Sequence, residues 1–141
     1  MKHIANIDNR EFLVREVLLH ASDTLPAETE KRLAEIRRDK PSVPVIYVAS
    51  GSAAIIAGSN ATAAATRLYL EEMGINGHVI MTGCHGPAAF EPMLCVHLPG
   101  KNKLIFRNIT DDKVEPLLNG VFHKDMPGED IVGQSGSFGF E

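Results

Sequence analysis

Apolar residues recur at helical spacing between about residues 9 and 21, which predicts a helix at the start of the chain. Thr24-Leu25-Pro26 then indicates a break and a second helix, because proline suits a first helical turn whose N–H has no partner anyway. Pro41 and Pro44 end this second helix, since proline blocks helix continuation and favours extended geometry in the preceding residue. Residues 1–44 are therefore predicted to form an N-terminal helical segment.

Short β-branched and apolar runs replace the helical spacing after residue 44, and they predict four strands. The first run, Val45 to Ala49, has the composition of a buried parallel strand between turn signals. Residues 99–102 have the composition of a reverse turn and join the last two strands. The other three strands are predicted at residues 78–82, 93–98 and 104–107.

Two helices are predicted among and after these strands. Ser50 to Ser59 is predicted to be a glycine-bearing loop, and the alanine-rich stretch from Asn60 to Met73 a helix. The last helix carries a conflict, because Pro116 lies where a helix interior would lose about 3 kcal/mol. We therefore expect the last helix proper to begin near Pro116, after a single turn, and to close at Gly120.

The order of elements predicts an α/β domain over residues 45–125, with a βαβ unit followed by a hairpin and a terminal helix. The right-handed crossover rule places the helix of residues 60–73 across the first two strands. The loops that follow these two strands then leave the sheet at the same edge. Residues 126–141 are rich in glycine and serine and poor in core residues, which is typical of a linker, here toward a C-terminal domain that is missing.

Composition narrows the function classes. The chain has 141 residues and a formal net charge of −4, which argues against a nucleic-acid-binding face. Its apolar runs fall short of the roughly 18 residues needed to cross a membrane. Two cysteines do not form a disulfide scaffold, so the protein is expected to be cytoplasmic. Spacing alone indicates no catalytic group, and the six histidines are too dispersed to predict a metal site.

The most informative stretch is the loop Met81-Thr82-Gly83-Cys84-His85-Gly86-Pro87-Ala88, ahead of Glu91-Pro92. Together with the loop Ala49-Ser50-Gly51-Ser52-Ala53-Ala54, it resembles the thioredoxin-like ferredoxin domain at the N-terminus of the NADH-binding flavoprotein subunit of NADH dehydrogenases. The resemblance covers roughly residues 43–134. It implies a thioredoxin-like fold of the two-iron ferredoxin type.

In that family the cluster-bearing members place cysteines as C-x4-C after the first strand and C-x3-C after the second. By resemblance, the four positions here are Ala49, Ala54, Cys84 and Ala88. Since a two-iron cluster takes four ligands, normally thiolates, the chain is interpreted as a degenerate form without a cofactor of its own.

The resemblance also implies a context for the domain. The parent chain would bind FMN, NAD and an iron–sulfur cluster in other domains. This domain would then be an accessory domain that docks against other subunits of an NADH-oxidising complex, foremost the two-iron ferredoxin-like subunit.

Two other functions stay open. Cys84 beside His85 is a candidate reactive thiol, because a neighbouring imidazolium lowers a thiol pKa, and the domain would then be a redox sensor. Alternatively, Cys84 from two chains shares a cluster and the domain transfers electrons.

Three further readings concern single features. Ser50-Gly51-Ser52 matches no phosphate-binding motif, so it is a weak signal for a nucleotide. Cys95 is expected in the core because its neighbours in a predicted strand are apolar. Pro92 stands where thioredoxin-like folds often hold a cis proline, although the sequence leaves cis and trans open.

Overall fold

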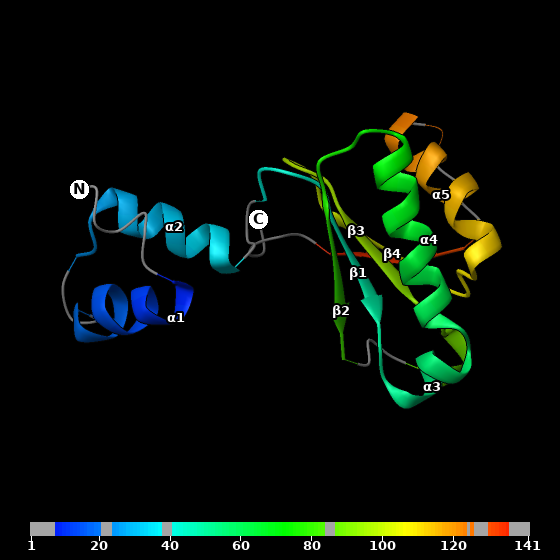
Figure 1. Cartoon of the computed structure of the whole chain (residues 1–141), viewed down its shortest axis with the longest axis horizontal. Coiled ribbons are helices and arrows are strands. Elements are labelled where there is room, and N and C mark those ends of the chain that lie inside the picture. Colours follow the sequence, from blue (N-terminus) through cyan, green and yellow to red (C-terminus); the bar gives the residue numbers. More distant parts are fainter. Residues whose placement is uncertain are drawn as a thin grey trace. The chain divides into compact units, whose positions relative to one another are not determined.

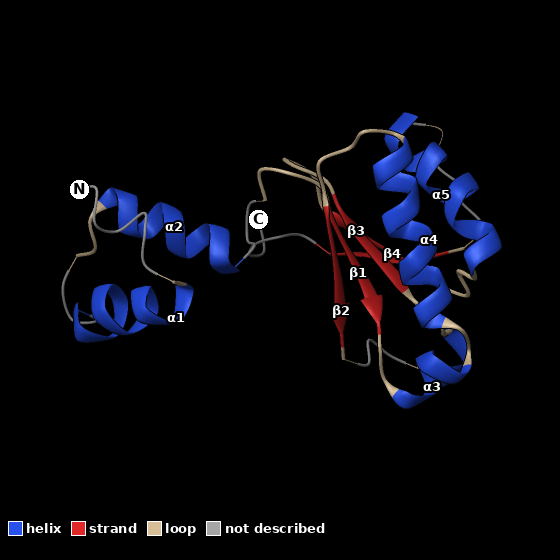
Figure 2. Cartoon of the chain, in the orientation of Figure 1, coloured by secondary structure: helices blue, strands red, loops and turns tan. Residues whose placement is uncertain are grey.

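The computed structural model describes residues 8–20, 24–37, 41–83, 87–123, 125 and 130–135. The chain divides into two compact units, residues 1–40 and residues 41–141. Figures 1 and 2 show the helices and strands of each unit.

The first unit is helical, as the sequence predicts. Asp8 caps its first helix by accepting hydrogen bonds from the backbone N–H groups of Arg10 and Glu11, at 2.7 and 3.1 Å. Phe12 is fully buried, and the guanidinium of Arg32 lies 4.5 Å from the centre of its ring. The elements are α1 (Asn9–Phe12), the π-helical η2 (Leu13–Val17), the 3-10 helix η3 (Leu18–His20) and α2 (Ala27–Arg37).

The second unit is built on a five-stranded sheet in the order β2-β1-β3-β4-β5. β1 and β2 are parallel, and the other neighbouring pairs are antiparallel. The predicted α/β fold with a βαβ unit and a following hairpin is confirmed. The strands are β1 (Val45–Ala49), β2 (His78–Thr82), β3 (Leu94–His97), β4 (Lys103–Phe106) and β5 (Ile131–Ser135).

Two long helices, α4 (Ser59–Glu72) and α5 (Asp111–His123), lie on one face of this sheet (Figure 1). Thr62 of α4 donates a buried hydrogen bond of 2.7 Å to the carbonyl of Ile109, just before α5. Tyr69 of α4 donates one of 2.7 Å to the side-chain oxygen of Asn119 in α5. The main core fills the space between this face of the sheet and the two helices. It includes Ile46, Val48, Leu70, Leu94, Val96, Phe106, Val114, Leu117 and Leu118.

The predicted loop of residues 50–59 is wrong in part, because it contains the short helix α3 (Ser52–Ile56). Gly51 has extended geometry at the N-cap of α3, and the buried Ala54 anchors the helix to the sheet. Gly58, with a φ of 102°, then turns the chain into α4. Since L-residues rarely adopt that φ, glycine is needed to separate the two helices.

The prediction for the last helix is also wrong, because α5 runs without a break through Pro116 and Gly120. The ring of Pro116 is exposed, whereas the neighbouring Leu117 and Leu118 are buried. Burying a leucine side chain contributes about 1.5–3 kcal/mol. Two such side chains therefore offset the cost of about 3 kcal/mol for an interior proline.

The predicted linker is wrong for five of its residues, which form β5 at the edge of the sheet. β5 pairs antiparallel with β4, so that Ile105 lies opposite Gly133 and Leu104 opposite Gln134. Composition points to a linker here because, among the five residues of β5, only Ile131 and Val132 are apolar. The strand forms because it pairs with β4, and the intrinsic strand propensity of its residues does not include that pairing.

Candidate functional site

The two loops singled out by the sequence leave the sheet side by side. β1 and β2 are parallel neighbours, with Ala49 opposite Thr82 at their carboxyl ends (Figure 2). Ser50 holds these ends together, because its backbone N–H and its hydroxyl both donate to the carbonyl of Thr82, at 2.8 and 2.5 Å. The prediction that both loops start from one edge is therefore confirmed.

The first loop carries an apolar cluster at this edge. Ala49 and Ala54 are both completely buried and pack with Met93, which is 3% exposed. Phe90 and Ile105 cover this cluster from the side. We name these five residues the alanine cluster. It places methyl groups and a thioether at the end of β1, in contact with each other.

The other two predicted cluster positions lie in the second loop. Ala88 begins the short 3-10 helix η4 (Ala88–Phe90) and is exposed. Cys84 lies outside the described residues, as does His85. The structure thus brings Ala49 and Ala54 together in one cluster and places Ala88 on the surface.

The end of the second loop is fixed by a hydrogen-bond network that the sequence analysis missed. The Glu91-Pro92 peptide bond is cis, which answers the question the sequence left open. The buried carboxylate of Glu91 accepts a hydrogen bond of 2.9 Å from the backbone N–H of Met93. Asn108 donates from its side-chain nitrogen to the carbonyls of Ala89 and Glu91, at 3.1 and 3.3 Å.

Asn108 also has a φ of 53°, the left-handed conformation. Asparagine adopts this conformation more readily than most residues because its short side chain bonds locally. Its backbone N–H donates to the carbonyl of Phe90 at 2.9 Å, and that of Ile109 donates to the carbonyl of Pro92 at 2.9 Å. Asparagine after β4 is the one sequence signal that could have pointed to this loop anchor.

The described residues do not fit a two-iron cluster. Such a cluster needs four ligands, normally cysteine thiolates, with histidine as an alternative at one iron. The side chains of Ala49, Ala54 and Ala88 offer no lone pair. Among the residues that the structure describes, no group of three His, Cys, Asp or Glu side chains could hold a metal ion.

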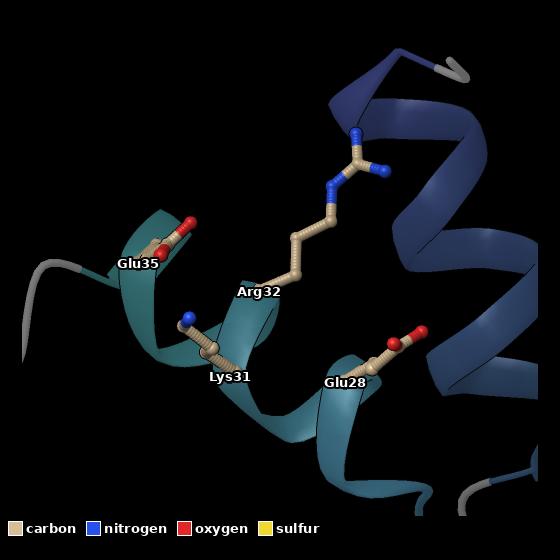
Figure 3. Close-up of a pocket in the computed structure, with 4 residues that line it drawn as sticks. All are labelled: Glu28, Lys31, Arg32 and Glu35. Atoms are coloured by element: carbon tan, nitrogen blue, oxygen red, sulfur yellow. The ribbon is translucent and has the colours of Figure 1, made fainter. Parts of the chain in front are cut away.

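A charged groove lies on the first unit, along one side of α2 (Figure 3). Arg32 points from this groove toward the preceding helical segment, where its guanidinium donates to the side-chain oxygen of Asn9 at 3.4 Å and stacks on Phe12. This side chain therefore holds the two helical segments together. The groove is lined by Glu28, Lys31, Arg32 and Glu35, whose opposite charges offset one another.

Cys95 lies in β3 on the sheet face opposite α4 and α5, and it is 7% exposed. The expectation that it packs in the core is confirmed. Burial raises the pKa of its thiol to about 11, although the charge of Lys103 acts in the opposite direction. Cys95 is therefore protonated at neutral pH and a poor nucleophile.

This raised pKa predicts a loss of stability at alkaline pH. The unfolded thiol ionises near its ordinary pKa, so the contribution of the neutral buried thiol is complete below about pH 8.5 and declines as the pH rises toward 11. We expect the free energy of unfolding to fall by about 2–3 kcal/mol more in the wild-type protein than in Cys95→Val. Urea unfolding at both ends of that pH range measures the difference. Equal losses of unfolding free energy in the two proteins would contradict a raised pKa at Cys95.

The fold defines the class of this domain, which is the thioredoxin-like ferredoxin fold. A structure of a thioredoxin-like 2Fe–2S ferredoxin from Aquifex aeolicus matches with a TM-score of 0.55 and 11% identity, over 67% of this chain and 94% of that one. A second structure, of a cysteine-to-serine variant of that ferredoxin, matches with a TM-score of 0.54 and 13% identity, over 64% and 98% of the two chains.

At these identities the likeness concerns the fold. No family model matches the sequence. No curated protein matches it either. None of the helices among the described residues has the length and apolar character that a membrane span requires.

Proposed function

We propose that this domain keeps the thioredoxin-like ferredoxin fold without its cluster and serves as an accessory docking domain of an NADH dehydrogenase-type oxidoreductase. The observation that carries the proposal is the alanine cluster. Ala49 and Ala54 are completely buried against Met93 at the carboxyl end of β1. By resemblance these two positions would hold thiolate ligands, and here they contribute to a small apolar core instead.

This packing supports a site that is adapted to the absence of a cluster. It argues against an unchanged cluster site that is merely empty. A cluster removed from an otherwise unchanged site would leave a cavity, and cavities cost stability in proportion to their volume. In this chain the methyl groups of both alanines are in contact with larger apolar side chains. The segment that follows the second loop is likewise held in place, by Asn108 and by the carboxylate of Glu91.

A fold retained without its redox centre is most simply explained by a retained interface. In the proposed context the domain binds other subunits of an NADH-oxidising complex, and the two-iron ferredoxin-like subunit is its foremost partner. NADH, FMN and a further iron–sulfur cluster would be bound by other domains of the parent subunit. The residues after β5 would connect to those domains, and the complex would operate in the cytoplasm.

Iron and acid-labile sulfide content, measured on the chain purified without oxygen, tests the loss of the cluster. We expect a colourless protein with neither element, both in the wild type and in Cys84→Ala. Stoichiometric iron and sulfide that disappear in Cys84→Ala would overturn the proposal and favour a cluster shared between two chains.

The docking role needs its own measurement. The tagged chain is used to capture proteins from the cells that produce it, and the captured material is assayed for FMN and for NADH oxidation by an artificial electron acceptor. We expect both to co-purify with the wild type and, equally, with Cys84→Ala. Material without flavin or NADH oxidation would contradict the docking role. Activity lost only in Cys84→Ala would favour a thiol-based function.

A further inference from the structure

The strand β2 forms one of the two lateral edges of the sheet. It is the terminal strand in the order β2-β1-β3-β4-β5, and among the described residues it pairs with β1 alone. Proteins protect such edges with charged side chains, prolines, bulges or very short strands. The sequence from Met73 to Phe90 contains no Asp, Glu, Lys or Arg, and β2 itself has no proline and pairs with β1 without a register shift.

The strand at the opposite edge of the sheet, β5, is less regular than β2. β5 carries Gly133, and its pairing with β4 has a register shift between Ile105 and Phe106. A bulge twists the strand locally and interrupts a regular row of hydrogen-bonding groups. One edge of the same sheet is therefore irregular, whereas β2 presents a regular one.

The hydrogen bonds to β1 show which backbone groups of β2 face outward. The N–H of His78 donates to the carbonyl of Pro44 at 2.9 Å, and the carbonyl of Thr82 accepts from the N–H of Ser50 at 2.8 Å. In a parallel pair, alternate residues of a strand direct both backbone groups to the same neighbour. His78, Ile80 and Thr82 therefore face β1, and the N–H and carbonyl groups of Val79 and Met81 point away from it.

We propose that two copies of this chain join their sheets edge to edge, with the β2 strands antiparallel about a two-fold axis at Ile80. This arrangement places Val79 opposite the partner's Met81 and Met81 opposite the partner's Val79. In an antiparallel pair such residues exchange both of their backbone hydrogen bonds. The outward N–H and carbonyl groups of Val79 and Met81 would all be hydrogen-bonded in this way. Each of the five residues of β2 would then lie opposite a residue of the partner's β2.

The side chains are self-complementary in the same register. Ile80 meets the partner's Ile80 on the face opposite α4 and α5, and His78 meets the partner's Thr82. On the helix face, Val79 meets the partner's Met81, and both side chains pack against the main core of their own sheet. Like charges directly opposite each other destabilise strand pairs, and this register brings none together because β2 has no acidic or basic residue apart from His78.

Disulfide trapping tests the register in the full chain. In a Cys84→Ala background we expect Ile80→Cys to form a covalent dimer on mild oxidation, because a pair opposite at the two-fold axis has Cα atoms about 4.5 Å apart, within disulfide range. His78→Cys alone should not cross-link, since its copies would lie more than about 10 Å apart at roughly 3.4 Å per residue. The double variant His78→Cys with Thr82→Cys should cross-link.

Sedimentation equilibrium over a wide range of protein concentration supplies the second measurement. We expect a reversible dimer in the wild type and association about 100-fold weaker in Ile80→Lys, which opposes two charges at the axis and loses apolar contact. Val132→Lys on β5 is the matched control and should dimerise as the wild type does. A monomer at all concentrations, a dimer indifferent to Ile80→Lys, or equal cross-linking of the two single cysteine variants would overturn the proposal.

Discussion

The variant Ala49→Cys/Ala54→Cys/Ala88→Cys is expected to bind a two-iron cluster, whereas the proposed function predicts none in the wild type. With Cys84 it would supply four thiolates at C-x4-C and C-x3-C spacing, on two loops that leave neighbouring parallel strands. The expected change is from no iron to about two irons per chain after anaerobic reconstitution. Iron, sulfide and a visible absorption spectrum measure it.

The control for this variant is the same set of substitutions in a Cys84→Ala background, which has only three of the four thiolates. Without metal, the sulfurs added at the buried Ala49 and Ala54 should cost about 1–3 kcal/mol each through overpacking. Iron should therefore raise the unfolding temperature of the four-thiolate protein and not that of the control. Equal iron uptake by both would show that these positions are not the degenerate cluster site.

Phe106→Ala is expected to lower the free energy of unfolding by about 3–5 kcal/mol. Phe106 is completely buried in the main core, where it lies between Leu94 of β3 and Ile131 of β5 in the sheet. Removing its ring leaves a cavity under both long helices. Because domains of this size are stable by only about 5–15 kcal/mol, the loss is a large part of the total.

Urea unfolding followed by circular dichroism measures this effect. The comparison is Leu68→Ala on α4, where the side chain is 54% exposed and the change should stay within about 0.5 kcal/mol. A loss below about 1.5 kcal/mol in Phe106→Ala would mean that the core collapses around the missing ring, contrary to the tight packing of protein interiors.

The elements with strong local signals were predictable from the sequence. The β-branched run predicts β1, and the alanine-rich stretch predicts α4. The helical crossover between β1 and β2 predicts that these two strands are parallel neighbours. The burial of Cys95 followed from its apolar neighbours. In these segments the local sequence and the final packing favour the same structure.

The remaining features depend on contacts between distant residues. α5 tolerates Pro116 because the two leucines that follow it, Leu117 and Leu118, are buried, and helix propensity does not include such burial. β5 exists through its pairing with β4. At the candidate site, the resemblance to the ferredoxin domain pointed to Ala49 and Ala54, but only the folded chain shows that both pack with Met93 in one cluster.

The place of β5 in the sheet also orders events during synthesis. A ribosome makes β1 through α5 in one stretch, and both long helices and four strands can associate before residue 131 emerges. Until then β4 forms an open edge that carries Leu104 and Ile105. Partly folded chains with unpaired edges are prone to aggregate. Pairing of β5 with β4 therefore removes an edge at which a nascent chain could aggregate with other chains. The described residues of β5 do so without contributing a side chain to the main core.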